Sequence, residues 1–260
     1  MKSETTIEFA VTAPQPGSGL GIASCARELV EVAMSNFAPT LPADDLPKGN
    51  GGVVLLIPGF LAGDWSMVRL RDFLTRIDYR VAFAGVAVNL GPTKGFIPQL
   101  DRAVERAFAA DERPIAVIGQ SLGGVYARGL AHRHPDKIRH VVTLCAPIHF
   151  PVATPLEGIA RLLAPFHDRA ALELQEEIGR APSVPVTAIY SKTDGIIDWR
   201  SCLQDEAAGY VNVEVSGSHS AMASNPNAQR VIAQALATGS GGLRSAPAKR
   251  ARQSGAKPDR

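Results

Sequence analysis

The sequence is poor in cysteine and aromatic residues and has no long apolar run. Its 260 residues include three cysteines, and aromatic residues make up 6%. Cys25, Cys145 and Cys202 form no Cys-x-x-Cys pair, so we expect reduced thiols packed as small apolar side chains. No apolar run approaches the ~20 residues that span a bilayer, and residues 1–6 lack the apolar stretch of a signal peptide. These absences predict a cytoplasmic protein without a transmembrane segment.

Glycine motifs that bind phosphate are also missing. The chain has no GxGxxG fingerprint, and residues 91–95 lack the spacing of a Walker loop. We therefore expect no nucleotide cofactor, and the isolated cysteines argue against a metal site.

The net charge of +2 hides an uneven distribution. From Leu243 onward, six basic residues accompany a single acidic residue, Asp259, so the rest of the chain is mildly acidic. Residues 240–260 have no apolar periodicity, which predicts a disordered basic tail. A solubilising role is favoured over contact with nucleic acid, an anionic lipid surface or an acidic partner, so no nucleic-acid partner is expected.

The most informative segment is residues 115–124, an apolar run that leads into Gly-Gln-Ser-Leu-Gly. A GxSxG motif between a strand and a helix is the context of a nucleophile elbow, in which the serine is held on a tight turn. Gly119 and Gly123 flank Ser121 where a Cβ would crowd the strand against the helix. A serine hydroxyl is a poor nucleophile until a base takes its proton. The segment therefore predicts Ser121 as a catalytic nucleophile that needs a histidine.

Strands and helices alternate along the rest of the chain. Apolar runs predict strands at residues 53–57, 81–84, 115–118, 141–144, 186–190 and 211–215. Helical periodicity predicts helices at residues 66–76, 96–107 and 228–237 and another directly after the GxSxG motif. Strands separated by helix-length crossovers indicate an α/β fold with a mainly parallel sheet and helices on both faces. We expect the site at the carboxyl ends of the strands.

Composition divides the chain into three parts. Residues 1–49 are expected to form an N-terminal leader with one amphipathic helix and a linker rich in proline and glycine. Residues 50–239 are expected to form the catalytic domain, and residues 240–260 the tail. Within the catalytic domain, residues 147–182 lie between two core strands and are predicted to be a small helical cap.

The last two predicted strands end in residues that suit the acid and the base of a catalytic triad. Asp194 follows one strand and His219 follows the other, so both should lie with Ser121 at the same edge of the sheet. His219 would take the proton from Ser121, and Asp194 would orient the imidazole and stabilise its cation. Asp198 is the alternative acid, and is otherwise a helix N-cap or a surface acid.

These segments resemble the α/β-hydrolase superfamily, in particular small bacterial serine esterases and lipases. The resemblance rests on Gly-Gln-Ser-Leu-Gly, the upstream Leu-Ile-Pro-Gly-Phe-Leu, and the later Ser-Lys-Thr-Asp-Gly-Ile-Ile-Asp-Trp and Gly-Ser-His-Ser, and it covers about residues 50–237. It implies an α/β-hydrolase fold and an oxyanion hole formed by the backbone amides of Phe60 and Leu122. Many relatives have His-Gly where this chain has Pro58-Gly59, so Leu61 is the alternative donor. Each well-aimed amide is worth ~3 kcal/mol to the transition state.

The cap suggests the character of the substrate. Its apolar residues would form one helical face over the elbow and suit an acyl chain, although ordinary packing onto the domain explains the same face. That face would consist of Leu156, Ile159, Leu162 and Leu163, joined by Ile148, Phe150, Val152 and Phe166. The candidate substrate-binding residues are Leu61, Ile148, Phe150, Leu162 and Leu163.

These residues predict a cofactor-independent serine hydrolase that cleaves carboxylic esters with apolar acyl groups through an acyl-enzyme. A small-molecule ester is the expected partner, and the oligomeric state is not predicted. An acyltransferase, a thioesterase or an intracellular polyester depolymerase could use the same triad. A non-catalytic binding scaffold is the alternative of another class, and an intact triad argues against it.

Overall fold

The computed structural model describes residues 11–15, 18–35, 41–167, 177, 180–205 and 209–238. The predicted basic tail, residues 240–260, lies outside these ranges, as does much of the second half of the predicted cap. In the described part of the chain, no helix is both long and apolar enough to cross a membrane.

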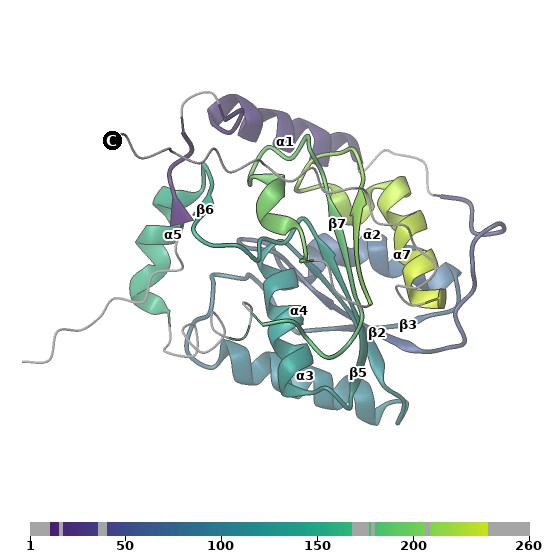
Figure 1. Cartoon of the computed structure of the whole chain (residues 1–260). Coiled ribbons are helices and arrows are strands. Elements are labelled where there is room, and N and C mark those ends of the chain that lie inside the picture. The colour runs from purple at the N-terminus through teal and green to yellow at the C-terminus, as the bar shows by residue number, and fades with distance from the viewer. Residues whose placement is uncertain are drawn as a thin grey trace, which may run out of the picture.

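The core is a sheet of six parallel strands in the order β3-β2-β4-β5-β7-β8 (Figure 1). The strands are β2 (Val53–Ile57), β3 (Arg80–Phe83), β4 (Ile115–Gln120), β5 (Ile138–Leu144), β7 (Val186–Tyr190) and β8 (Tyr210–Glu214). Every residue of β2, β4 and β7 is buried, as expected for a parallel sheet that is covered on both faces. The predicted α/β class and its mainly parallel sheet are confirmed.

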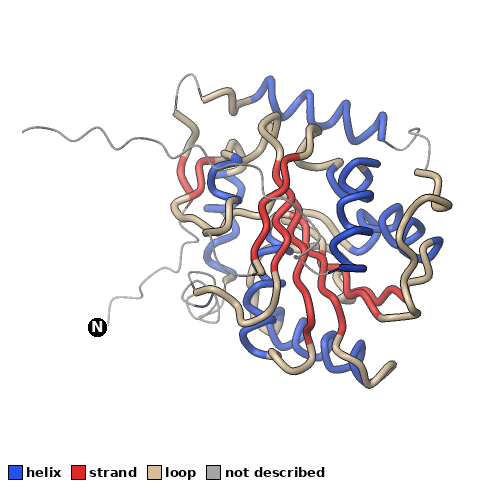
Figure 2. Tube along the Cα trace, turned by 45° about the vertical axis from the view of Figure 1, so that its right-hand side comes forward, coloured by secondary structure: helices blue, strands red, loops and turns tan. Residues whose placement is uncertain are grey.

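Helices cover both faces of the sheet. Successive residues of a strand point to opposite faces, so each strand contributes side chains to both layers. The main ones are α2 (Val68–Arg76), α3 (Phe96–Ala109), α4 (Leu122–Arg133) and α7 (Pro226–Thr238). Leu55 and Val117 share one core cluster with α3 and α4, whereas Leu56 and Ile118 share the other with α2 and α7. Figure 2 shows the strands enclosed by these helices.

The strand order places the ends of β2 and β4 side by side. β3 pairs with one side of β2 and β4 with the other, so the chain changes direction across the sheet at β2. Ile57 at the end of β2 pairs with Gly119 near the end of β4. The loop after β2 therefore lies beside the turn after β4, at the edge where open parallel sheets bind ligands.

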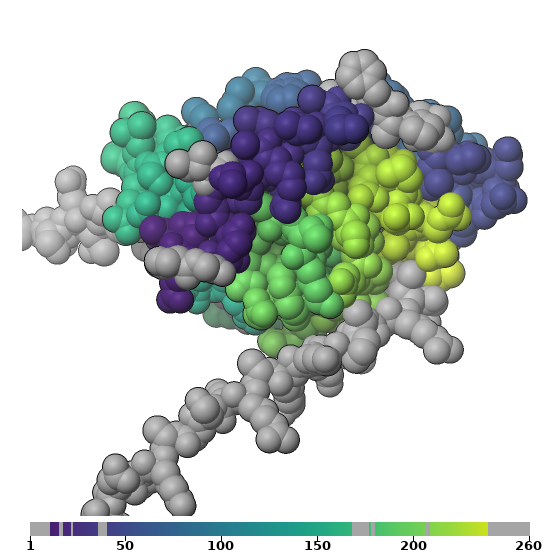
Figure 3. Space-filling model, turned by 90° about the horizontal axis from the view of Figure 1, so that it is seen from above, coloured from purple at the N-terminus to yellow at the C-terminus, as the bar shows by residue number. Residues whose placement is uncertain are grey.

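The predicted N-terminal leader contacts both the segment predicted to be the cap and the loops at the carboxyl ends of the strands. Its strand β1 (Val11–Thr12) pairs in parallel with β6 (Val152–Ala153) of the cap. Its helix α1 (Ile22–Ser35) is the predicted amphipathic helix and lies across the loops after β7 and β8 (Figures 1 and 3). The cap also contains the short helix α5 (Glu157–Leu163). The sequence does not predict the pairing of β1, because two residues carry no strand periodicity.

Candidate active site

Ser121 occupies the sharp turn between β4 and α4. Its φ of 51° and ψ of −124° lie in a strained region that residues with a Cβ seldom adopt. Two backbone hydrogen bonds fix the turn: Ser121 N–H donates to Leu144 O at 2.8 Å, and Ser121 O accepts from Gly124 N–H at 2.8 Å. The GxSxG motif thus forms the strand–turn–helix geometry that the sequence predicts for a nucleophile elbow.

The two glycines that flank the serine are required by close backbone contact. A Cβ on Gly119 would lie 2.2 Å from Gly123 O, and a Cβ on Gly123 would lie 2.3 Å from Ile57 O. Neither contact is possible without moving the backbone. The glycines therefore let β2, the turn and α4 approach one another closely enough to bring Ser121 to the edge of the loop after β2.

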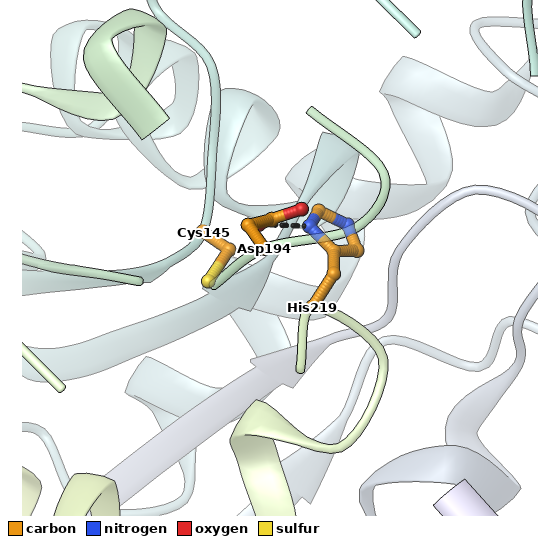
Figure 4. A group of neighbouring side chains, drawn as sticks. All are labelled: Cys145, Asp194 and His219. Atoms are coloured by element: carbon orange, nitrogen blue, oxygen red, sulfur yellow. Dashed lines mark hydrogen bonds and ion pairs between the residues drawn. The ribbon is translucent and has the colours of Figure 1, made fainter. Parts of the chain in front are cut away.

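Asp194 and His219 form a buried hydrogen-bonded pair. Asp194 Oδ2 lies 2.7 Å from His219 Nδ1, and both side chains are buried (Figure 4). The other oxygen, Oδ1, accepts the N–H groups of Ile196 and Ile197 at 2.8 and 2.9 Å. Because an ionised carboxylate only accepts, Nδ1 carries a proton in this contact and Nε2 is left as the basic nitrogen of the neutral imidazole.

Asp198, the alternative acid, has a different role. Its carboxylate accepts the N–H of Arg200 at 3.0 Å and caps the 3₁₀ turn Trp199–Cys202. It also forms an exposed ion pair with the Arg200 guanidinium. The geometry therefore favours Asp194 as the acid and gives Asp198 the capping role.

The surroundings of His219 change its basicity in opposing directions. Burial lowers its pKa, but the charge and hydrogen bond of Asp194 raise it, and Glu28 of α1 adds a smaller upward effect. The net result is that the pKa of His219 is raised above its ordinary value of 6.5. A more basic imidazole is a stronger acceptor for the proton of a serine hydroxyl.

Gln120, the last residue of β4 and the residue before the serine, forms hydrogen bonds with the loop that carries His219. Its side-chain N–H₂ donates to His219 O at 2.9 Å and to Ser220 O at 3.2 Å. Among the described residues, no hydrogen bond joins Ser121 Oγ to His219. Catalytic hydrogen bonds of this kind often shorten only when substrate binds. Gln120 therefore holds the candidate base and the candidate nucleophile on adjacent segments.

Cys145 lies next to the pair formed by Asp194 and His219. Its sulfur and the nearest ligand atoms of Asp194 and His219 all lie within 4.8 Å of one another, a spacing that could suit a metal ion (Figure 4). Burial and the charge of Asp194, however, raise the pKa of the thiol well above its ordinary value. His219 Nδ1 is also already engaged by Asp194. A protonated thiol and an occupied nitrogen make a poor ligand set, because metals bind the thiolate and a free imidazole nitrogen.

The two predicted oxyanion donors lie beside the serine. Phe60 follows Gly59, where an added Cβ would lie 3.1 Å from Ser121 Cβ. Leu122 directly follows the serine at the start of α4. Within the described residues, the backbone N–H groups of Phe60 and Leu122 have no hydrogen-bond partner. The N–H of Leu61, the alternative donor, is already bonded to Asn89 O at 2.8 Å. The geometry therefore favours Phe60 over Leu61.

Asn89 holds the loop that carries Phe60. Its side-chain N–H₂ donates to Pro58 O at 2.9 Å, and its backbone bonds to Leu61 N–H and to Ala62 O, each at 2.8 Å. Asn89 is fully buried in the loop after β3. The sequence analysis does not identify this residue, because nothing in its local pattern indicates a contact with a loop about 30 residues away.

A mainly apolar pocket opens beside Ser121. Its volume is about 90 Å³, and Ser121, Phe60 and Leu122 all contribute to its lining. Other walls come from Phe150 and Leu156 of the cap region, from the loop after β7, and from the leader. The loop after β7 contributes Ile196 and Ile197, and the leader contributes Val11. The pocket can accept an apolar group next to the candidate nucleophile.

The predicted substrate residues take different places. Phe150 lines the pocket, whereas Ile148 packs into the core cluster of α3 and α4. Leu162 is 73% exposed and lies outside the pocket, as do Leu61 and Leu163. The reason is the orientation of α5, which turns the side of Leu156 and Ala160 to the pocket and that of Ile159 and Leu162 to the surface. Leu156, rather than Leu162 or Leu163, therefore lines the pocket.

Comparison with solved structures identifies the fold. Aspergillus fumigatus lipase B superposes with a TM-score of 0.60 at 18% identity, over 78% of this chain and 57% of that chain. The monoacylglycerol lipase of Paleococcus ferrophilus gives a TM-score of 0.54 at 15% identity, over 74% of this chain and 96% of that one. A pyrethroid hydrolase from Sphingobium faniae JZ-2 gives 0.53 at 19% identity, over 72% and 98%. This chain thus spans little more than half the length of lipase B.

Comparisons with models of protein families and with curated proteins found no match. These solved structures are less than 20% identical to this chain, so the comparison establishes its architecture alone. The chain has the α/β-hydrolase fold, as its sequence resemblance predicts.

Proposed function

We propose that this chain, which has the α/β-hydrolase fold, is a serine hydrolase that cleaves carboxylic esters with an apolar acyl group. The observation that carries the proposal is the buried pair of Asp194 and His219, 2.7 Å apart, at the same edge of the sheet as Ser121 on its strained turn. A buried, hydrogen-bonded acid and imidazole beside a nucleophile that lines a pocket is the arrangement that acyl transfer requires.

The first half of the proposed reaction forms an acyl-enzyme. His219 Nε2 takes the proton of Ser121 as its Oγ attacks the ester carbonyl carbon, and the carbonyl oxygen becomes negatively charged. The N–H groups of Phe60 and Leu122, which have no hydrogen-bond partner among the described residues, would stabilise that charge. When the intermediate collapses, the C–O bond to the leaving alcohol breaks and His219 gives its proton to the alkoxide.

The second half releases the acid. A water molecule attacks the acyl carbon while His219 removes one of its protons, and the bond to Ser121 Oγ breaks as that proton returns to the serine. Asp194 stabilises the imidazolium in each half. The upward shift of the His219 pKa supports this role.

The pocket supports an apolar acyl group as the substrate portion bound next to Ser121. Its walls are mainly apolar, and a pocket of this kind gains binding energy from hydrocarbon rather than from charge. Two of the solved neighbours are named as lipases and the third as a pyrethroid hydrolase, which is consistent with apolar substrates.

A series of p-nitrophenyl esters tests the proposal. The purified chain should hydrolyse esters of short and medium acyl length, and Ser121→Ala should reduce kcat by roughly 10⁴-fold or more without lowering the melting temperature. His219→Ala should cause a similar loss, and the double variant should lose little more, because the two residues act as a unit. Undiminished hydrolysis by Ser121→Ala would overturn the proposal.

A further inference from the structure

We propose that Glu28 of the leader helix α1 is a positioning residue for the candidate active site. It holds the acid loop, residues 191–198 after β7, next to the base loop, residues 215–221 after β8. The inference rests on the proposed function, because it assigns Glu28 a role toward Asp194 and His219. It makes α1 part of the catalytic machinery, whereas the sequence alone suggests a separate leader.

Both oxygens of the Glu28 carboxylate bind backbone N–H groups of the two loops. Oε1 accepts from Gly195 N–H and His219 N–H, each at 2.9 Å, and Oε2 accepts from Ser220 N–H at 2.8 Å. Gly195 directly follows the candidate acid, and His219 is the candidate base. One side chain thus connects the residues that must meet for the acid–base pair to form.

The carboxylate is deeply buried, which makes its hydrogen bonds costly to lose. Glu28 is 2% exposed, and a buried carboxylate without partners is strongly destabilising. Its partners here are main-chain N–H groups, which form charge-assisted hydrogen bonds with it. A Cβ on Gly195 would lie 3.0 Å from both Cγ and Oε1 of Glu28, so the glycine at this position permits the approach.

Two further residues of α1 bind the acid loop from the same side of the helix. Ser24 Oγ donates to Gly195 O at 2.7 Å, and Arg27 Nη2 donates to Thr193 O at 2.5 Å. Ser24, Arg27 and Glu28 are spaced at three and four residues, which places them on one face of a helix. Viewed from above, α1 in purple lies across the green and yellow part of the chain that carries these loops (Figure 3).

Glu28 also acts on the imidazole through its charge. The ionisable groups that face His219 are Asp194 from the loop after β7, Cys145 from the end of β5 and Glu28 from α1. Burial raises the pKa of the Cys25 thiol of α1, and the charge of the nearby Glu28 carboxylate raises it further. Glu28 and Asp194 both favour the imidazolium of His219, so removing the Glu28 charge should make His219 less basic.

The test compares Glu28→Gln with Glu31→Gln, which makes the same chemical change one turn later on the same helix. Glu31 is partly exposed and, among the described residues, forms an ion pair with Arg27 alone, at 3.5 Å. Glutamine keeps one acceptor oxygen but turns an N–H₂ group toward backbone donors, so at least one of the three backbone hydrogen bonds is lost, together with the carboxylate charge. We expect Glu28→Gln to lower kcat at least tenfold with KM changed less than about threefold, whereas Glu31→Gln stays within about twofold of wild type.

The pH profile separates positioning from general loss of stability. The acid limb of kcat/KM reports the pKa of the free base, so it should move to lower pH in Glu28→Gln and stay in place in Glu31→Gln. Glu28→Asp keeps the charge on a shorter side chain, so it should restore the limb to its wild-type position and part of kcat. An unmoved limb and an unchanged kcat in Glu28→Gln would overturn the inference.

Two controls keep the outcomes distinct. Absence of ester hydrolysis in the wild-type chain would refute the proposed function itself, whereas an active wild type with indifferent Glu28→Gln refutes only the role of Glu28. If Glu28→Gln does not fold, Ser24→Ala decides the question. It removes the bond to Gly195 but keeps the charge, so the inference predicts a lowered kcat with an unmoved acid limb, and an unchanged kcat would contradict it.

Discussion

The backbone N–H of Leu61 donates to the carbonyl of Asn89 at 2.8 Å, and this contact fixes the loop that carries the candidate oxyanion donor Phe60. The bond occupies the N–H of Leu61, whereas the N–H of Phe60, a residue that lines the pocket with Ser121, has no partner among the described residues. In the proposed reaction, Asn89 therefore favours Phe60 over Leu61 as the donor to the developing charge.

Asn89→Ala should lower kcat more than it raises KM. The change removes the side-chain bond to Pro58 O and lets the loop shift, which misplaces one donor whose full loss costs ~3 kcal/mol. We expect kcat to fall about tenfold or more. Leu90→Ala, a change at the exposed neighbouring residue, serves as the control in ester hydrolysis assays. Equal effects of the two variants would show that the loop does not depend on Asn89.

Asp194→Asn should abolish most of the activity, whereas Asp198→Asn should not. The asparagine amide would favour the wrong imidazole tautomer, so kcat near neutral pH should fall by around 10⁴-fold. Asp198 caps a 3₁₀ turn and does not contact His219, so its variant should stay within about tenfold of wild type. Steady-state kinetics at pH 7.5 measure both, and the reverse ranking would mean that the acid is misassigned.

Leu156→Ala should change the preference between acyl chain lengths, and Leu162→Ala should leave it unchanged. Leu156 lines the pocket, whereas Leu162 on the same cap segment is exposed. The change at Leu156 enlarges the pocket, so the ratio of kcat/KM for medium chains to that for short chains should change. The change should correspond to about 1 to 3 kcal/mol of activation free energy. The measurement is the ratio of kcat/KM across the ester series. A shift caused by Leu162→Ala alone would place the acyl group on the opposite face of α5.

His140 should make the fold sensitive to mild acid. Burial, and to a lesser extent Arg139, lower the pKa of this histidine from 6.5 to about 4, and its Nε2 lies 3.0 Å from Thr187 Oγ1. The unfolded chain therefore binds a proton between about pH 6.5 and 4 that the folded chain does not, so the stability present above pH 6.5 is lost as the pH falls toward 4. Between pH 7.5 and 5 the loss from this group should be about 2 kcal/mol.

Urea unfolding at these two pH values checks the prediction. His140→Gln removes the titrating group, so the difference in unfolding free energy between pH 7.5 and 5 should shrink by about that amount. His149→Gln, at an exposed histidine, should leave the difference as it is in the wild type. A difference that is unchanged in His140→Gln would mean that other groups cause the acid sensitivity.

The sequence predicts the framework of the site because its signals are local. The apolar run of β2 is continuous and that of β7 is interrupted by Thr187 alone, and Ser121 sits in a motif of five residues whose glycines have a direct steric cause. Asp194 and His219 can be found because each follows a predicted strand, and parallel strands end at one edge of a sheet.

The remaining features depend on contacts between distant segments. Glu28 bonds to residues 167 and 191 positions away, and nothing near it in the sequence marks a partner. The orientation of α5 is likewise not encoded locally, because both sides of this helix carry apolar residues and only packing decides which side is covered. The sequence therefore points to the candidate catalytic groups but not to the residues that hold them in place.

The most direct test of the account is the covalent labelling of Ser121 by a fluorophosphonate. The probe reacts with a serine that a neighbouring base has activated, so intact mass spectrometry of the wild-type chain should show one adduct, and peptide mapping should place it on Ser121. Ser121→Ala should remove the adduct, and Asp194→Asn should slow its formation. No adduct on the folded wild-type chain, or an adduct that persists in Ser121→Ala, would contradict the assignment of Ser121 as an activated nucleophile.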